Sequence, residues 1–345
     1  MNGILTAVYS IIIFSLIIFV HEFGHFITAK AFGVLVHEFA IGMGPAIFKK
    51  QKGETLYSVR AIPIGGYCAM EGENGESEDP RSFGKKSKFK RFIILAAGAV
   101  MNLILGFAVI SLFFGVNNQE YFVSTVIESV DEGSPAYEAG LLPGDKVIRV
   151  NGHSLTVKSE VEIYGSFDKA YNLTVKRGKE KLNFSIVPRE TETVIDGKTY
   201  KRRIMGIRFA TVEKNFATML EYSFKNTVFM GKLVFISLGQ LLSGAASPSS
   251  LSGPVGIINE INTAASSGLA DILYLMALIT INIGLFNLLP IPALDGGRIL
   301  FIIIEAIIRK PIPAKYEGLC HGIGFALLIG LMLFATGNDI MRLIK

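Results

Sequence analysis

The side chains with the clearest capacity for chemistry form the pattern His-Glu-x-x-His at residues 21–25. On a helix, residues four positions apart share one face, so His21 and His25 can hold one zinc ion between them. Zinc lowers the pKa of a bound water towards about 7, and Glu22 can act as general base on that water and pass its proton to a leaving amine. The pattern therefore predicts hydrolysis of peptide bonds, with Glu22 as the catalytic residue.

The surroundings of this pattern favour a metal site over the simpler alternative, in which both histidines are ordinary residues on a helix surface. The pattern lies inside an apolar run at residues 4–29. A charged group within a bilayer costs roughly 2.5 to 3.5 kcal/mol on insertion scales. Three titratable residues in one turn of a membrane span therefore need partners or a function.

Asp295 is the best candidate for a third ligand, because a catalytic zinc site uses three protein ligands and keeps an open position for water. It is the only acidic residue between positions 272 and 304. Pro290 and Pro292 each remove a backbone donor, and two glycines follow the carboxylate, so we predict a broken helix that lets Asp295 turn inwards. The alternatives are a helix cap or a lone carboxylate facing a neighbouring span.

Composition places these residues in a lipid bilayer. Of the 345 residues, 50% are hydrophobic and 18% are charged, and the mean hydropathy is +0.45, which is too apolar for an ordinary soluble domain. We expect a polytopic α-helical membrane protein with about four transmembrane helices. The apolar stretches lie at residues 4–29, 92–115, 272–308 with a break, and 320–336. A fifth stretch at 216–242 contains charged residues and is predicted to be an amphipathic interfacial helix.

The distribution of basic residues predicts the topology. The net charge is +5, and lysine and arginine gather beside the predicted spans at residues 49–52, 81–91 and 309–315. The positive-inside rule explains these clusters better than nucleic-acid binding, so no nucleic-acid partner is expected. Cytoplasmic clusters place residues 116–270 outside and residues 21–25 late in a span that enters the cytoplasm. We expect a multi-pass protein of a cell membrane, in contact with lipid, with its active site towards the cytoplasm.

Two segments are predicted to contain β-structure. Residues 40–67 hold two apolar strand-like runs separated by a Lys/Gly turn, which indicates a membrane-associated β-hairpin. Short alternating runs bounded by turn residues indicate a soluble β-rich domain at 119–212. The predicted organisation has three parts: an N-terminal membrane core at 1–118, the β-rich domain at 119–212, and the amphipathic helix with a C-terminal membrane core at 213–345.

Several motifs occur in the order that the site-2 protease family shows. They are HEFGH (21–25), GMGP (42–45), RAIPIGGY (60–67), GSPAYEAGLLPGDKVIRVNG (133–152), SGPVGI (252–257) and NLLPIPALDGGR (287–298). The chain resembles this family over nearly its whole length, most closely the bacterial regulator-of-sigma-E protease branch, and residues 133–152 resemble a bacterial PDZ domain. It departs from that branch in having room for one PDZ domain where two are common, and in Met43, which replaces the more usual phenylalanine.

The resemblance implies an intramembrane zinc metalloendopeptidase, with Zn²⁺ held by His21, His25 and Asp295, and with Glu22 as its base. It implies single-span membrane protein substrates, such as anti-sigma factors or remnant signal peptides, cut in regulated intramembrane proteolysis. The residues expected to bind substrate are Asn282, Asn287, Gly42, Met43 and Gly44. The two amides could equally satisfy a neighbouring backbone group. The single PDZ domain is expected on the extracytoplasmic side, either to bind extended peptides or to exclude bulky proteins.

Two other functions fit part of the sequence. A non-proteolytic, membrane-anchored PDZ adaptor would have no need for the set of titratable residues in the membrane. A metal transporter would usually show internal repeats and a polar pathway through several spans, and neither is visible. A Glu22→Gln variant separates the three functions, because a protease would keep its zinc and lose cleavage, whereas transport or adaptor activity would survive.

Overall fold

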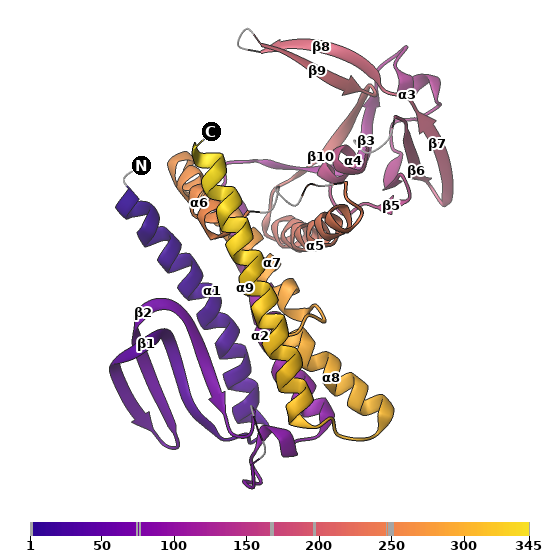
Figure 1. Ribbon diagram of the computed structural model, residues 1–345. Coiled ribbons are helices and arrows are strands. Elements are labelled where there is room, and N and C mark those ends of the chain that lie inside the picture. The colour runs from indigo at the N-terminus through magenta and orange to yellow at the C-terminus, as the bar shows by residue number, and fades with distance from the viewer. Residues whose placement is uncertain are drawn as a thin grey trace. The chain divides into compact units, whose positions relative to one another are not determined.

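The computed structural model describes residues 3–344, except residues 74, 76, 166–168, 196–197, 246 and 248–251. The chain divides into two compact units. The first unit contains Met1–Phe113 and Met230–Lys345, and the second contains Phe114–Phe229. Helices dominate the first unit and β-strands dominate the second (Figure 1).

Four helices within the described residues are long and apolar enough to cross a membrane. They are α1 (Gly3–Ala31), α2 (Lys88–Val116), α7 (Leu269–Leu288) and most of α9 (Ala314–Ile344). At a rise of 1.5 Å per residue, helices of 20 residues or more span about 30 Å of hydrocarbon. The predicted number of membrane helices is confirmed, and the chain is a multi-pass membrane protein. Helix α5 (Phe216–Leu242) is not one of the four.

The predicted break in the third apolar stretch is also confirmed. Helix α7 ends at Leu288, and α8 (Asp295–Ile308) begins with the aspartate itself. The six residues between them contain both prolines, which cannot donate backbone hydrogen bonds. A Cβ on Gly296 would lie 2.1 Å from the carbonyl oxygen of Leu289. The glycine therefore lets the start of α8 pack directly against the broken segment.

Helix α6 (Pro254–Ser267) packs against α1 and α9 within the first unit. Thr6 of α1 donates a hydrogen bond to Asn262, and the buried Asp339 of α9 accepts one from the backbone N–H of Gly256. A Cβ on Gly256 would lie 2.8 Å from Asp339 Oδ1, and a Cβ on Gly253 would be equally close to its Oδ2. The glycines of the SGPVGI segment thus make room for a carboxylate at the helix N-terminus, which favours negative charge.

Strands β1 (Val36–Lys52) and β2 (Thr55–Met70) pair antiparallel in a two-stranded sheet. The register is more elaborate than a simple hairpin, because Glu38 pairs with both Ala69 and Leu56, and the next three residues also have two partners each. The first part of β1 is therefore flanked by both halves of β2, whereas residues 66–70 have one partner each and form an outer segment.

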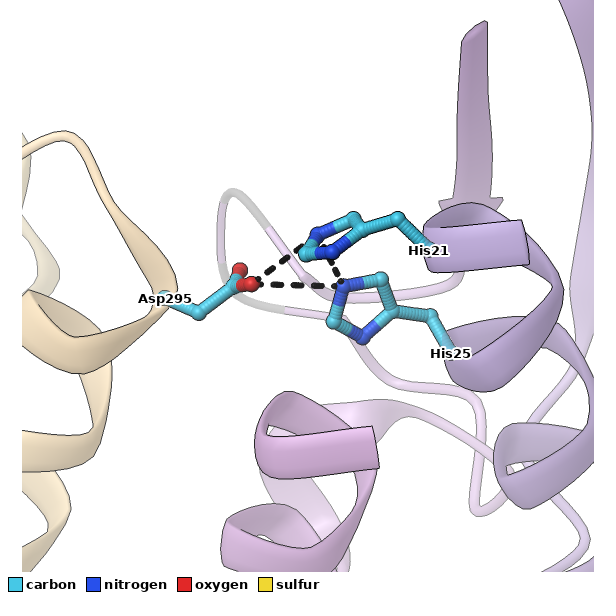
Figure 2. Close-up of side chains that lie close together, drawn as sticks. All are labelled: His21, His25 and Asp295. Carbon is cyan, nitrogen blue, oxygen red and sulfur yellow. Dashed lines mark hydrogen bonds and ion pairs between the residues drawn. The ribbon is translucent and has the colours of Figure 1, made fainter. Parts of the chain in front are cut away.

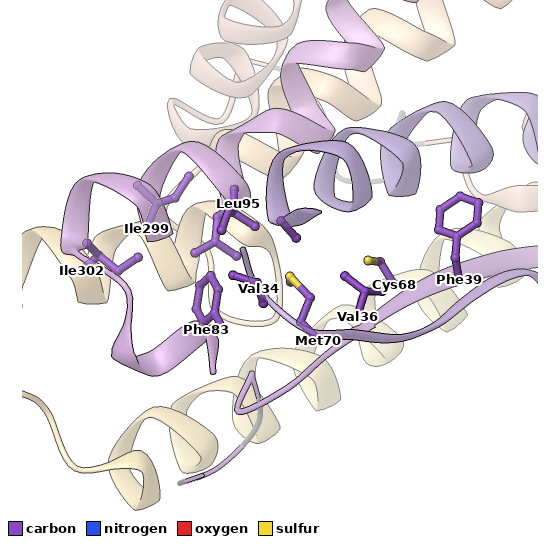
Figure 3. Close-up of a cluster of buried hydrophobic side chains, with 11 residues drawn as sticks. Val34, Val36, Phe39, Cys68, Met70, Phe83, Leu95, Ile299 and Ile302 are labelled. Carbon is purple, nitrogen blue, oxygen red and sulfur yellow. The ribbon is translucent and has the colours of Figure 1, made fainter. Parts of the chain in front are cut away.

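A buried apolar cluster ties this sheet to the helices (Figure 3). It combines side chains from α1, β1, β2, α2, α8 and the short 3₁₀ helix Phe83–Lys85. The cluster includes Phe39, Cys68, Leu95, Ile299 and Ile302. Burial of this kind is worth about 1.5–3 kcal/mol for each large side chain. It holds α8, and with it Asp295, against the rest of the unit.

The second unit is built on a six-stranded sheet with the path β10-β3-β4-β6-β7, and with β5 beside β4. These strands are β3 (Tyr121–Val130), β4 (Lys146–Val150), β5 (His153–Ser154), β6 (Tyr171–Arg177), β7 (Glu180–Ile186) and β10 (Ile207–Glu213). Two further strands, β8 (Arg189–Ile195) and β9 (Lys198–Ile204), pair with each other in a separate two-stranded sheet. Helix α4 (Ser159–Gly165) contributes Val161 to a core that also contains Val147, Leu173 and Ile186.

Residues 133–152 form a short helix, a turn and a strand in succession. Helix α3 (Pro135–Glu138) is capped by Ser134, whose side chain accepts a hydrogen bond from the backbone N–H of Tyr137. A Pro-Gly-Asp turn then leads into β4, and Asn151, directly after this strand, has a positive φ of 48°. Asparagine and glycine tolerate this left-handed conformation, so the Asn-Gly pair can end the strand in a tight turn.

Candidate metal centre

Helix α1 places His21 and His25 on one face, as their spacing predicts. Their ring centroids are 4.8 Å apart and their planes cross at 79°. The two Nε2 atoms are 3.2 Å apart. His25 is buried, and 12% of the His21 side chain is exposed. Two imidazole nitrogens therefore face the same point at the side of a membrane helix.

Asp295 reaches this point from the start of α8 (Figure 2). Its Oδ2 atom lies 3.1 Å from His21 Nε2 and 3.4 Å from His25 Nε2. Ligands at about 2.0–2.1 Å from one zinc ion in tetrahedral geometry are about 3.3–3.4 Å apart, so the three separations fit such a site. Asp295 Oδ2 is buried and has no hydrogen-bond partner. Three acceptor atoms this close would repel one another, and a cation between them removes that cost.

Helix α2 packs directly behind the two imidazoles. A Cβ on Gly24 of α1 would lie 2.4 Å from the carbonyl oxygen of Ala97, and a Cβ on Gly98 would lie 2.4 Å from His25 Nε2. Side chains at either position would force the helices or the ring apart. Small residues are the usual means of close helix packing in membranes.

Two groups of α2 also contact the far nitrogens of the imidazoles. His25 Nδ1 lies 2.8 Å from the carbonyl oxygen of Ile94, and His21 Nδ1 lies 3.3 Å from Nδ2 of the fully buried Asn102. Neither Asn102 nor Gly98 was identified from the sequence. A signal existed, since Asn102 and Ser111 are the only polar side chains in the apolar stretch 92–115.

Glu22, the predicted base, lies beside the β1/β2 sheet. A Cβ on Gly66 of β2 would lie 3.5 Å from Glu22 Cγ, which is ordinary contact distance. Glu22 directly follows His21 on α1, so its side chain starts from the same turn of the helix as the two histidines. It lies beside one end of the outer segment 66–70.

The five predicted substrate-binding residues lie on two elements. Asn282 and Asn287 are on α7, and Asn282 Oδ1 is buried without a hydrogen-bond partner. Gly42 and Gly44 have φ values of +83° and +82° on either side of Met43, whose side chain is 52% exposed on β1. Within the described residues, no hydrogen bond or ion pair joins these five residues to His21, His25 or Asp295. Their role stays a prediction.

A cavity of about 700 Å³ lies in the first unit, between the segment that follows β2, α2, α8 and the start of α9. Two ion pairs belong to its lining: Arg298 Nη1 is 2.5 Å from Glu73 Oε1, and Arg91 Nη1 is 2.9 Å from Glu305 Oε2. The first pair ties the segment after β2 to α8, one turn beyond Asp295.

Comparison with known proteins gives the class of this membrane protein. The model of the family described as Peptidase family M50 matches residues 9–331. The chain belongs to this family, and the resemblance to the site-2 proteases that the motifs indicated is confirmed.

Individual relatives match the chain from end to end. A protein of Clostridium perfringens named as a zinc metalloprotease is 38% identical over 340 residues, which cover 97% of this chain and 98% of the relative. The regulator of sigma-W protease RasP of Bacillus subtilis is 31% identical over 424 aligned positions, with 98% and 99% coverage. The zinc metalloprotease RasP of Shouchella clausii is also 31% identical, with 96% and 98% coverage.

Proposed function

We propose that this chain is an intramembrane zinc metalloendopeptidase of the site-2 type, which hydrolyses peptide bonds within or near transmembrane segments of other membrane proteins. The observation that carries the proposal is the convergence of His21, His25 and Asp295, whose ligand atoms all lie within 4.8 Å of one another. Membership of a peptidase family and the printed names of the relatives support hydrolysis, and those names specify zinc.

The proposed chemistry divides between the metal ligands and Glu22. His21, His25 and Asp295 would hold Zn²⁺ and leave a fourth position open. The bound ion would supply a Lewis acid that lowers the pKa of water and polarises the substrate carbonyl. Glu22 accepts the proton of the attacking water and donates it to the leaving amine. With neutral imidazoles, the carboxylates of Glu22 and Asp295 balance a divalent charge, which a site inside a bilayer requires.

The proposed substrate is extended beside the β1/β2 sheet. A transmembrane helix hides its carbonyls in internal hydrogen bonds, so it must unwind before it can be cut. Residues 66–70 form an outer segment that begins in contact with Glu22, and an unwound strand can pair with such an edge. Further contacts are assigned to Asn282 and Asn287, and to the turn at Gly42, Met43 and Gly44. Replacing single amides of a model substrate by esters should slow its cleavage at alternate positions, and uniform tolerance of esters would contradict strand pairing.

The proposed location is a bacterial plasma membrane, with the metal centre towards the cytoplasm. Basic residues such as Lys85, Lys88 and Arg309 flank the end of the first unit that contains the candidate ligands. By the positive-inside rule, this end faces the cytoplasm. Residues 119–212 are then extracytoplasmic.

The second unit is proposed to be a single PDZ-like domain. A groove of about 660 Å³ runs between α4 and the start of β10, and its lining includes Val161, Arg203, Gly206 and Phe209. Strand β10 is at the edge of its sheet, so it can pair with an extended peptide. The unit either docks such a peptide or excludes substrates with bulky external domains. By analogy with the sigma-W regulator of Bacillus subtilis, single-span anti-sigma factors are the proposed substrates.

The proposed function is tested with purified protein in lipid vesicles that also contain a single-span model substrate. The wild-type chain should bind one zinc ion and cut within the predicted span. Glu22→Gln should keep the zinc and lower the cleavage rate by about 10²–10⁴-fold, the usual contribution of a general base. A membrane-anchored adaptor would show no metal-dependent cleavage at all. Wild-type protein without stoichiometric metal, or a fully active Glu22→Gln variant, would contradict the proposal.

A further inference from the structure

Helix α2 presents three groups to the imidazoles at a regular spacing of four residues. They are the carbonyl oxygen of Ile94, the bare backbone of Gly98 and the side-chain amide of Asn102. Residues four apart lie on one face of a helix, so the three groups form a line along α2. None of them is a candidate metal ligand. What they have in common is contact with His21, His25 or both.

The first group sets the state of His25. A carbonyl oxygen can only accept a hydrogen bond, so the 2.8 Å contact requires that His25 Nδ1 carries the proton. Nε2 of the neutral ring then has a free lone pair, and this atom faces Asp295 and His21. The backbone of α2 thereby holds His25 in the tautomer that can bind a metal through Nε2.

The side-chain amide of Asn102 faces His21, but in its present orientation the amide oxygen has no hydrogen-bond partner. Nδ2 lies 3.3 Å from His21 Nδ1, while Oδ1 is buried and has no hydrogen-bond partner. With Nδ2 as donor, His21 would carry its proton on Nε2, the atom directed at Asp295. The oxygen and nitrogen of an amide are assigned from their hydrogen bonds. Reversal of this amide lets Oδ1 accept from His21 Nδ1–H and frees Nε2.

We propose that Asn102 is a positioning residue, which holds His21 in the Nε2-ligating tautomer as the Ile94 carbonyl holds His25. This inference rests on the proposed metal site. Gly98, between the two, leaves the space in which both rings can stand, since a Cβ there would lie 2.8 Å from His21 Cε1 as well as 2.4 Å from His25 Nε2. One face of α2 thus orients both histidines of α1. Hydrogen bonds to the outer nitrogen of a ligating histidine typically change metal affinity by 10–100-fold.

The test measures metal affinity rather than cleavage. The full-length protein in detergent is titrated with Co²⁺ in competition with a chelator, and its visible spectrum is recorded. Asn102→Leu removes the acceptor at nearly constant volume and should weaken binding by about 10–100-fold. Asn102→Asp keeps an acceptor and should stay within a few-fold of wild type. Asn338→Leu is the matched control, because it makes the same change at a buried asparagine of α9, and it should leave affinity unchanged.

The outcomes separate this inference from the proposed function. If the wild-type protein binds no Co²⁺ or Zn²⁺, the metal site itself is wrong. If the wild-type protein binds metal and Asn102→Leu binds it equally well, the positioning role is overturned. Equal losses of metal affinity in Asn102→Leu and Asn102→Asp would also overturn it. They would show that the amide acts on His21 as a hydrogen-bond donor and not as an acceptor.

A second measurement determines the protonation of the His21 ring directly in the wild-type protein. Nitrogen-15 spectra of wild-type protein with labelled histidine report which ring nitrogen of His21 carries the proton, and a His21→Ala variant assigns the signal. Protonated Nδ1 in the zinc-loaded protein supports the proposal. Spectra that show an unprotonated Nδ1 in the zinc-loaded protein overturn it.

Discussion

In the first unit, the side chains of His21, His25 and Asp295 lie within an apolar helical bundle and face one another, with no more than 19% of any of them exposed. In the second unit, most buried side chains are apolar, such as Val147 and Leu173, and the buried carboxylate of Asp145 is paired with Arg177 at a strand end. An ionisable residue is costly in a bilayer and ordinary in water. Polar residues therefore point to function in the first unit, whereas apolar residues point to structure in the second.

The largest effect that this contrast predicts is the loss of the metal in Asp295→Ala. Removal of one of three ligands should weaken Zn²⁺ binding by more than about 100-fold, because loss of an outer hydrogen bond to a ligand already costs 10–100-fold. Metal content after gel filtration measures it. Asp271→Ala, which removes an acidic residue from the first turn of α7, should retain the ion. Full occupancy in Asp295→Ala would mean that the carboxylate is only structural.

The second unit should respond most strongly to a cavity in its apolar core. Leu173 is 1% exposed, so Leu173→Ala should lower the free energy of unfolding of this unit by about 2–5 kcal/mol. Hydrogen exchange of peptides from residues 119–212 in the full-length protein measures this change. Leu142→Ala, at a 50% exposed position, should have a much smaller effect. Metal binding should be the same in both variants, and a parallel loss of metal would break the contrast between the units.

A third prediction concerns backbone space at the start of α8. A Cβ on Gly296 would lie 2.1 Å from a backbone oxygen, so Gly296→Ala should displace the neighbouring carboxylate of Asp295. Misplacement of a reacting group by about 1 Å can lower a rate about 10²-fold. The measurement is the cleavage rate of a model substrate at saturating zinc. Gly318→Ala on α9, where a Cβ meets nothing within 4 Å, is the control and should be fully active.

The smallest effect concerns pH and the second unit. The Arg177 guanidinium, at 2.7 Å, holds the pKa of the Asp145 carboxyl below its usual value. A lowered folded-state pKa contributes stability above the unfolded value of about 3.9, and this contribution disappears as the pH falls through the folded value. The unit should therefore lose stability below about pH 4, and Asp145→Asn should reduce that dependence. Urea-dependent hydrogen exchange, corrected for intrinsic rates, measures how the free energy of unfolding of this unit changes with pH. If Asp145→Asn shows the same pH dependence as the wild type, other carboxyl groups are responsible for it.

Much of the first unit could be predicted because its signals are local. The spacing of His21 and His25 needs only the period of a helix, and the break before Asp295 needs only two prolines and two glycines. Length and hydropathy were enough to predict the four membrane helices.

Other features depended on contacts between segments far apart in the chain. The doubled register of β1 and β2 follows from how both strands bend, and residue alternation does not report it. The need for glycine at positions 253 and 256 becomes clear only from the structure, in which Asp339 lies against both residues.

By itself, the sequence determined which residues can bind a metal and that they lie in a membrane, because rare polar groups stand out in apolar helices. Only the tertiary structure decided which groups of the neighbouring helix contact these residues. Helices in a bilayer pack through shape and single hydrogen bonds, without the hydrophobic pattern that marks a contact face in water. For this reason Gly98 and Asn102 acquired a role only when α2 was placed against α1.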